Sequence, residues 1–87
     1  MLTRVTSSGF EYKITDESID DMDLVEALAE VDSGSKLAIT KVLSLLFGED
    51  QKKALYEHLR EKYGRVPISA VESELMDVIK NSKDGKN

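Results

Sequence analysis

Hydrophobic residues recur at helical spacing through most of this chain, and the rows they form are separated by glycine, serine and proline. The clearest stretch covers residues 35–79, where the apolar rows are interrupted at Gly48 and again between Gly64 and Pro67. Spacings of three and four residues predict amphipathic helices, while glycine and proline commonly end them. The pattern therefore predicts a mostly helical chain with short connections.

Residues 1–14 show a different pattern, because polar and apolar positions alternate there. A period of two residues predicts β-strands, and Ser8-Gly9 is typical of the two-residue turn of a hairpin. Two strands alone are only marginally stable, so their apolar face must lie on helices or join strands of another chain, and their open edge is a candidate assembly surface. The pairs expected across the hairpin are Val5 with Tyr12 and Thr3 with Ile14, on the face that carries Phe10.

Four helices are expected after the hairpin, each with an inward apolar row. Capping residues and glycines set the expected limits of these helices, which are Thr15 or Asp16 to Asp32-Ser33-Gly34, Ser35 to Gly48, Glu49 to Gly64, and Ser69 to Ile79. The expected rows are Ile19, Met22, Val25, Leu28 and Val31; Ile39, Val42, Leu43 and Leu46; Leu55, Leu59 and Tyr63; and Ile68, Val71, Leu75, Val78 and Ile79. The predicted fold is α+β and mostly α, with an N-terminal β-hairpin followed by about four short helices in one small bundle.

Composition limits the size of this bundle. A chain of 87 residues that is 40% hydrophobic can close one modest core, so residues 1–80 are expected to form a single compact domain and residues 81–87 a flexible polar tail. There is no cysteine, which excludes disulfides and thiolate chemistry. No secretory signal and no apolar run long enough for a bilayer is visible, so we expect a cytoplasmic protein without a membrane partner.

Charge is unevenly distributed along the chain. The net charge of −5 argues against general binding to nucleic acid, whose phosphates it would repel. No basic residue occurs between Lys13 and Lys36, a segment rich in carboxylates. These acids either form a solvated face balanced by basic faces elsewhere in the fold, or meet a basic patch on a partner or on a second copy. They are Asp16, Glu17, Asp20, Asp21, Asp23, Glu26, Glu30 and Asp32.

No constellation for catalysis, metal binding or cofactor binding is apparent. His58 is the only histidine, and Asp20, Asp21 and Asp23 lack the glycine and the bidentate glutamate of a calcium loop. The hydroxyls at residues 7–8 have no identifiable base and suit a turn. We therefore expect a protein that is not an enzyme, with no catalytic, cofactor-binding or metal-binding residue.

The helix pair over residues 36–62 resembles a helix-turn-helix, with Gln51, Lys52, Lys53 and Arg60 available to DNA. Acids interrupt that surface, which makes DNA binding the less favoured interpretation. They are Glu49, Asp50, Glu57 and Glu61.

Four segments carry a resemblance to a known family. They are Val5-Thr6-Ser7-Ser8-Gly9-Phe10-Glu11-Tyr12, Met22-Asp23-Leu24-Val25-Glu26-Ala27-Leu28-Ala29-Glu30, Leu45-Leu46-Phe47-Gly48-Glu49-Asp50-Gln51 and Gly64-Arg65-Val66-Pro67-Ile68. In this order the chain resembles small acidic proteins of phages and prophages of Gram-positive bacteria, similar to tail assembly chaperones of long-tailed phages. The resemblance implies coating of the long helical tape measure protein until tail tube subunits replace the chaperone.

The resemblance also suggests a longer form of the protein. Gly85-Lys86-Asn87 can be encoded by GGA AAA AAC, which contains a heptamer on which ribosomes slip backward, and such chaperones often have a frameshifted longer product. The nucleotide sequence across these codons tests this hypothesis.

If the chain binds a protein partner, its surplus apolar residues are the candidate contacts. They are Leu45, Phe47 and Tyr56 on the helices, with Phe10 and Tyr12 of the hairpin. The competing expectation for each is that it fills the core. The alternative functions are a small oligomerising adaptor or a modulator of a host protein, followed by helix-turn-helix DNA binding.

Overall fold

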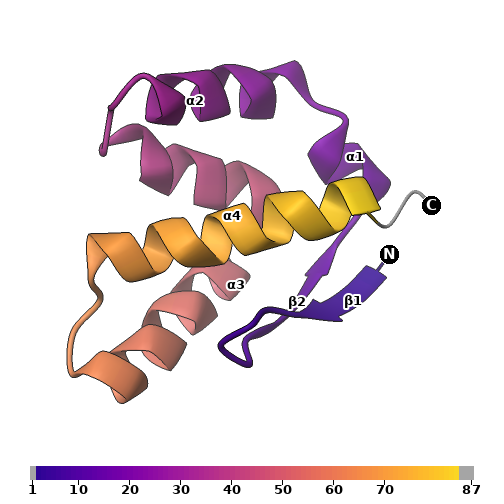
Figure 1. Ribbon diagram of the computed structural model, residues 1–87. Helices are drawn as coiled ribbons and strands as arrows, with labels where there is room; N and C mark the ends of the chain where they lie inside the picture. Colours follow the sequence, from indigo (N-terminus) through magenta and orange to yellow (C-terminus); the bar gives the residue numbers. More distant parts are fainter. Residues whose placement is uncertain (1, 85–87) are drawn as a thin grey trace.

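The computed structural model describes residues 2–84 as a two-stranded antiparallel sheet followed by helices (Figure 1). This confirms the expected mostly helical fold with an N-terminal hairpin. The segment Gly85-Lys86-Asn87, on which the frameshift hypothesis depends, lies outside the described residues. The elements are β1 (Leu2–Val5), β2 (Glu11–Ile14), α1 (Asp16–Ile19), α2 (Met22–Asp32), α3 (Ala38–Tyr63) and α4 (Ile68–Asp84).

The hairpin has a three-residue loop, so the predicted register is wrong by one residue. Gly9 N–H donates to the Thr6 carbonyl at 3.0 Å, and Gly9 has φ 96°, which together place a tight turn and a left-handed glycine between the strands. The pairs are Leu2 with Ile14, Thr3 with Lys13, Arg4 with Tyr12, and Val5 with Glu11. Val5 and Thr3 therefore lie on the outer face, opposite to the buried Phe10, Tyr12 and Ile14.

The predicted first helix is divided into α1 and α2. Thr15 caps α1 and Asp21 caps α2, each accepting a backbone N–H with its side-chain oxygen. The new start at Asp21 changes which residues face inward. Leu24 and Ala27 are buried, whereas the prediction that Met22 and Val25 face inward is wrong, since they are 66% and 47% exposed. Ile19, Leu28 and Val31 of the expected row do pack against the core.

Helix α3 consists of two helical segments joined at Gly48, whose φ of 79° and ψ of 168° are not helical. The break confirms the expected end of one helix and start of the next at this glycine. The inward row of the first segment is confirmed, because Ile39, Val42, Leu43 and Leu46 are all buried. In the second segment Leu55 and Leu59 are buried, but Tyr63 is 51% exposed, so its prediction as a core residue is wrong.

Gly64 ends α3 in the left-handed conformation, with φ 78°, as the sequence predicts. Helix α4 then begins at Ile68 and continues to Asp84, into the segment expected to be a tail. Its buried row is Val71, Leu75 and Val78. Ile68 is 54% exposed, in contrast to its predicted inward position.

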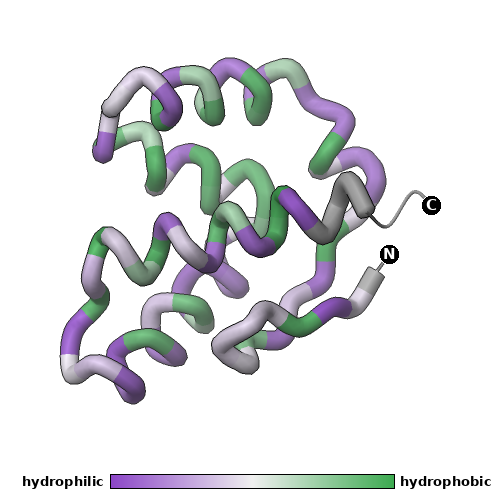
Figure 2. Tube along the Cα trace, in the orientation of Figure 1, coloured by the Kyte–Doolittle hydropathy of each residue, from purple (hydrophilic) through white to green (hydrophobic). Residues whose placement is uncertain are grey.

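The core lies where α3 meets the other elements. In Figure 1, α2 lies along the first segment of α3, and α4 crosses α3 on the side facing the viewer. The strand β2 packs against α3 through its inward face, which closes the remaining side. Figure 2 shows hydrophilic and hydrophobic positions interspersed along the whole of α2.

Candidate functional site

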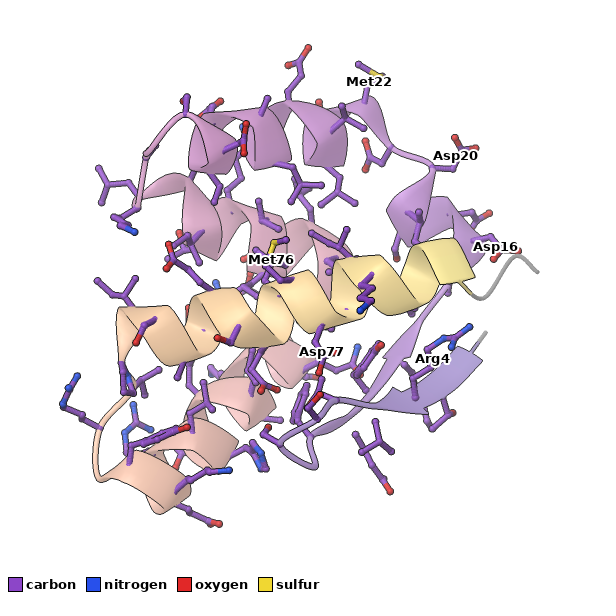
Figure 3. The ribbon with its side chains drawn as sticks, in the orientation of Figure 1. Arg4, Asp16, Asp20, Met22, Met76 and Asp77 are labelled. Atoms are coloured by element: carbon purple, nitrogen blue, oxygen red, sulfur yellow. The ribbon has the colours of Figure 1, made fainter. Side chains whose placement is uncertain are left out.

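The hairpin loop is fastened to α3 and α4 by two polar contacts. Ser8 Oγ lies 3.0 Å from His58 Nε2, and the N–H of Ser7 donates to Asp77 Oδ2 at 2.6 Å. Figure 3 shows the Asp77 side chain directed from α4 toward the hairpin. Hydrogen bonds from Ser7 lower the pKa of Asp77 below its ordinary value of 3.8, and the bond from the Ser7 backbone has a larger effect than the bond from its side chain. The loop is thus held by groups distant in sequence.

The Ser8–His58 pair provides a base that the sequence did not reveal, and a hydroxyl beside an imidazole is a component of nucleophilic centres. Ser8 Oγ also lies 3.2 Å from Thr6 Oγ1, within the turn itself. Among residues 2–84, the imidazole ring of His58 has no other hydrogen-bond partner, and an activated serine needs a third group that orients the imidazole. The contact is sufficiently explained as an anchor for the loop.

Three of the five candidate partner-binding residues belong to the core. Phe10, Tyr12 and Phe47 are 5%, 1% and 6% exposed. Their rings form one cluster, in which Phe47 meets Phe10 and Tyr12 edge-on at centroid distances of 6.1 Å and 5.6 Å. These rings hold the hairpin to α3, and in this fold they are not accessible to a partner.

The other two candidates, Leu45 and Tyr56, are only partly buried and line separate hollows. Leu45 borders a hollow of about 490 Å³ between the end of β2 and the break in α3. Tyr56 borders one of about 300 Å³ between α3 and the start of α4, together with Ile39, Ile68 and Val71. The structure therefore does not bring the five candidates together into one surface.

The open edge of β2, which the sequence offers for assembly, is occupied at Lys13 by a glutamine side chain. Gln51 Nε2 donates to the carbonyls of Lys13 and Phe47 at 2.7 Å and 2.9 Å, while its Oε1 accepts the N–H of Lys13 at 2.6 Å. The amide side chain thus pairs with both backbone groups of Lys13, as a neighbouring strand would. It covers the edge and secures the break at Gly48 to the hairpin.

A buried carboxylate lies in a groove of about 980 Å³ along α4 and the hairpin loop. Glu74 is 5% exposed, and its Oε1 has no hydrogen-bond partner among the described residues. The sequence contained a signal for this position, since Glu74 lies three residues after Val71 and four before Val78, on the buried row. Within residues 2–84, no group of three or more His, Cys, Asp and Glu is placed to hold a metal ion.

The cationic residues that suggest DNA binding are partly neutralised by neighbours. Lys52 Nζ lies 3.1 Å from Glu49 Oε1 and donates to Ser44 Oγ at 2.7 Å. Arg60 pairs with Glu57 on the same helix. These contacts reduce the positive charge that this surface offers to phosphates.

Large apolar side chains remain exposed on β1, α2, α3 and α4, and directly before α3. The sequence pattern did not identify four of them as surface residues, because it placed them in inward rows; they are Met22, Val25, Tyr63 and Ile68. Isolated exposed apolar residues are ordinary, but several on one helix face indicate a contact surface. The exposed set is Val5, Met22, Val25, Leu37, Tyr63, Ile68 and Met76.

Comparison of the chain with known protein families, with curated proteins and with solved structures finds no match. Among the described residues, no helix is both long enough and apolar enough to cross a membrane.

Proposed function

We propose that this chain is a non-enzymatic protein-binding domain, and specifically a phage tail assembly chaperone that binds the tape measure protein during tail morphogenesis. The observation that carries the proposal is that large apolar side chains are left exposed on a small acidic domain, among them Met22 at 66% and Val25 at 47% on one helix. Such surface is unfavourable in water and becomes favourable when a partner covers it.

The resemblance of four segments to small acidic phage proteins makes the proposal specific. A chaperone for a long helical protein needs repeated weak contacts with apolar helix faces, and copies of a small domain along one chain supply them. Tail tube subunits then take the place of the chaperone. Neither step requires a reactive centre.

The alternative is a small oligomerising adaptor or modulator of a host protein, acting in the cytoplasm of the bacterial cell. Such a protein would use the same exposed apolar residues. The two proposals differ in the partner, so the choice between them depends on which protein is bound.

Co-expression with the tape measure protein of the same genome tests the proposal. The tape measure protein is expressed alone, with this chain, or with an unrelated small acidic protein as a control for charge. We expect it to stay in the soluble fraction and to co-purify only with this chain. Precipitation to the same extent in all three cultures would refute the chaperone function.

A further inference from the structure

Helix α2 is apolar on two opposite sides. Its inner side carries Leu24 and Ala27, which are 4% and 0% exposed, with Leu28 and Val31 packed beside them. These four residues already supply the row that fixes α2 on α3. The remaining apolar residues of α2 therefore need another explanation.

The second apolar side points into solvent. At about 100° per residue, Met22, Glu26 and Ala29 project within about 60° of one another, opposite to the inner row, and Val25 stands beside them. Figure 3 shows Met22 directed away from the body of the protein. We call this surface the outer face of α2; it consists of Met22, Val25, Glu26 and Ala29, flanked by Asp23, Glu30 and Asp32, and all seven are exposed.

The charge around this face has one sign. Helix α2 contains no basic residue, and in the described part of the chain its carboxylates take part in no ion pair. Glu30 and Asp32 also lie in the last turn, where the negative end of the helix dipole disfavours anions. The carboxylates thus add nothing to the stability of the fold through ion pairing, and those in the last turn oppose the dipole.

We propose that the outer face of α2 is a docking surface for a basic amphipathic helix of a partner protein. This inference rests on the proposed function for the claim that a protein is bound. It adds the face of the domain that binds and the chemical character of the partner segment. Met22, Val25 and Ala29 would meet the apolar row of the partner, while lysines or arginines beside that row would meet the flanking carboxylates. A second copy of α2 does not fit, because two acidic faces would repel each other.

Binding of a synthetic helix to the full chain tests the proposal. The probe is a fluorescein-labelled leucine-lysine peptide of roughly 18 residues, long enough for an amphipathic helix, titrated with the protein and followed by anisotropy. We expect M22S/V25S to weaken binding roughly tenfold through lost apolar contact. The matched control is L37S/M76S, which removes two exposed apolar side chains elsewhere and should leave the Kd within about twofold of wild type.

A pair of charge variants separates local from general attraction. E26K and E61K change the net charge of the protein equally, but only Glu26 belongs to the outer face. We expect E26K to weaken binding more than E61K. Equal Kd values for E26K and E61K, or for M22S/V25S and L37S/M76S, would overturn the proposal, and circular dichroism of each variant excludes unfolding as the cause.

The outcomes distinguish this inference from the proposed function. If wild type keeps the tape measure protein soluble and M22S/V25S does so equally well, the chaperone function stands and the outer face of α2 is not its site. If light scattering shows that wild type is a dimer and M22S/V25S a monomer, the face binds a second copy and the proposal is refuted.

Discussion

The break in α3 depends on one backbone conformation, and replacing Gly48 by alanine tests it. Gly48 has φ 79° and ψ 168°, a combination adopted essentially by glycine alone. Apart from the local backbone, a Cβ at this position would have no atom within 4 Å, so G48A introduces backbone strain without a clash against another part of the protein. Any loss of stability must then come from the dihedral angles.

A second glycine provides the matched reference. Gly64 has nearly the same φ, 78°, but a ψ of −5° in the left-handed helical region, and its Cβ would also meet open space. Alanine there costs roughly 1 kcal/mol, whereas the conformation of Gly48 should cost ~3 kcal/mol. The entropy lost by the unfolded chain is similar in both variants and cancels in the comparison.

Urea unfolding followed by circular dichroism measures the difference. We expect G48A to lose ~2 kcal/mol more than G64A, which for a domain of this size corresponds to a Tm lower by at least about 8 °C. If G48A is as stable as G64A or more stable, the two segments of α3 do not depend on a fixed break, and the account of the fold is refuted.

Three further substitutions test other contacts. D77N should remove the stability that the lowered pKa of Asp77 supplies at neutral pH. In urea unfolding at several pH values, the difference in free energy of unfolding between wild type and D77N should shrink as the pH falls below about 3.8 and through the folded-state pKa. A difference that does not change with pH would contradict this. Y12F should leave the free energy of unfolding unchanged or raise it, because Tyr12 Oη is buried without a partner among the described residues, and a loss above ~1 kcal/mol in urea would disprove the idea. Q51E keeps the size of Gln51 but removes both N–H donors, so we expect the free energy of unfolding to fall by about 1–3 kcal/mol and amide exchange in the hairpin to become faster. Exchange rates equal to those of wild type would contradict the role of Gln51.

The sequence predicts best where a helix is long and has a single buried side. In the first segment of α3 all four residues of the expected row are buried, and Gly48 and Gly64 end helices as expected. In these places local propensity, apolar period and glycine conformation agree.

Apolar residues spaced three positions apart do not by themselves predict which side of α2 faces inward. Successive steps of three residues rotate by about 60° around a helix, so Met22, Val25, Leu28 and Val31 cannot all face one side. The row that faces α3 includes Leu24 and Ala27 instead. Because α2 is apolar on two sides, the periodicity by itself does not identify which side is buried.

The hairpin register and the polar anchors depend on contacts distant in sequence. Ser8-Gly9 is compatible with a two-residue or a three-residue loop, and Phe10, Tyr12 and Ile14 share one face in either case, so the alternation along the second strand does not choose between them. His58 of α3 contacts Ser8 across 50 residues of sequence, and Asp77 of α4 accepts the N–H of Ser7 across 70. No local pattern encodes these pairs.

If this domain binds the tape measure protein as proposed, the two proteins form a complex that light scattering on the co-expressed, affinity-purified fraction detects. We expect one complex in which each tape measure protein carries several copies of this 9.7 kDa chain, and in which M22S/V25S is depleted relative to wild type. Elution of the chain without any tape measure protein, at the same position as when it is expressed alone, would contradict it.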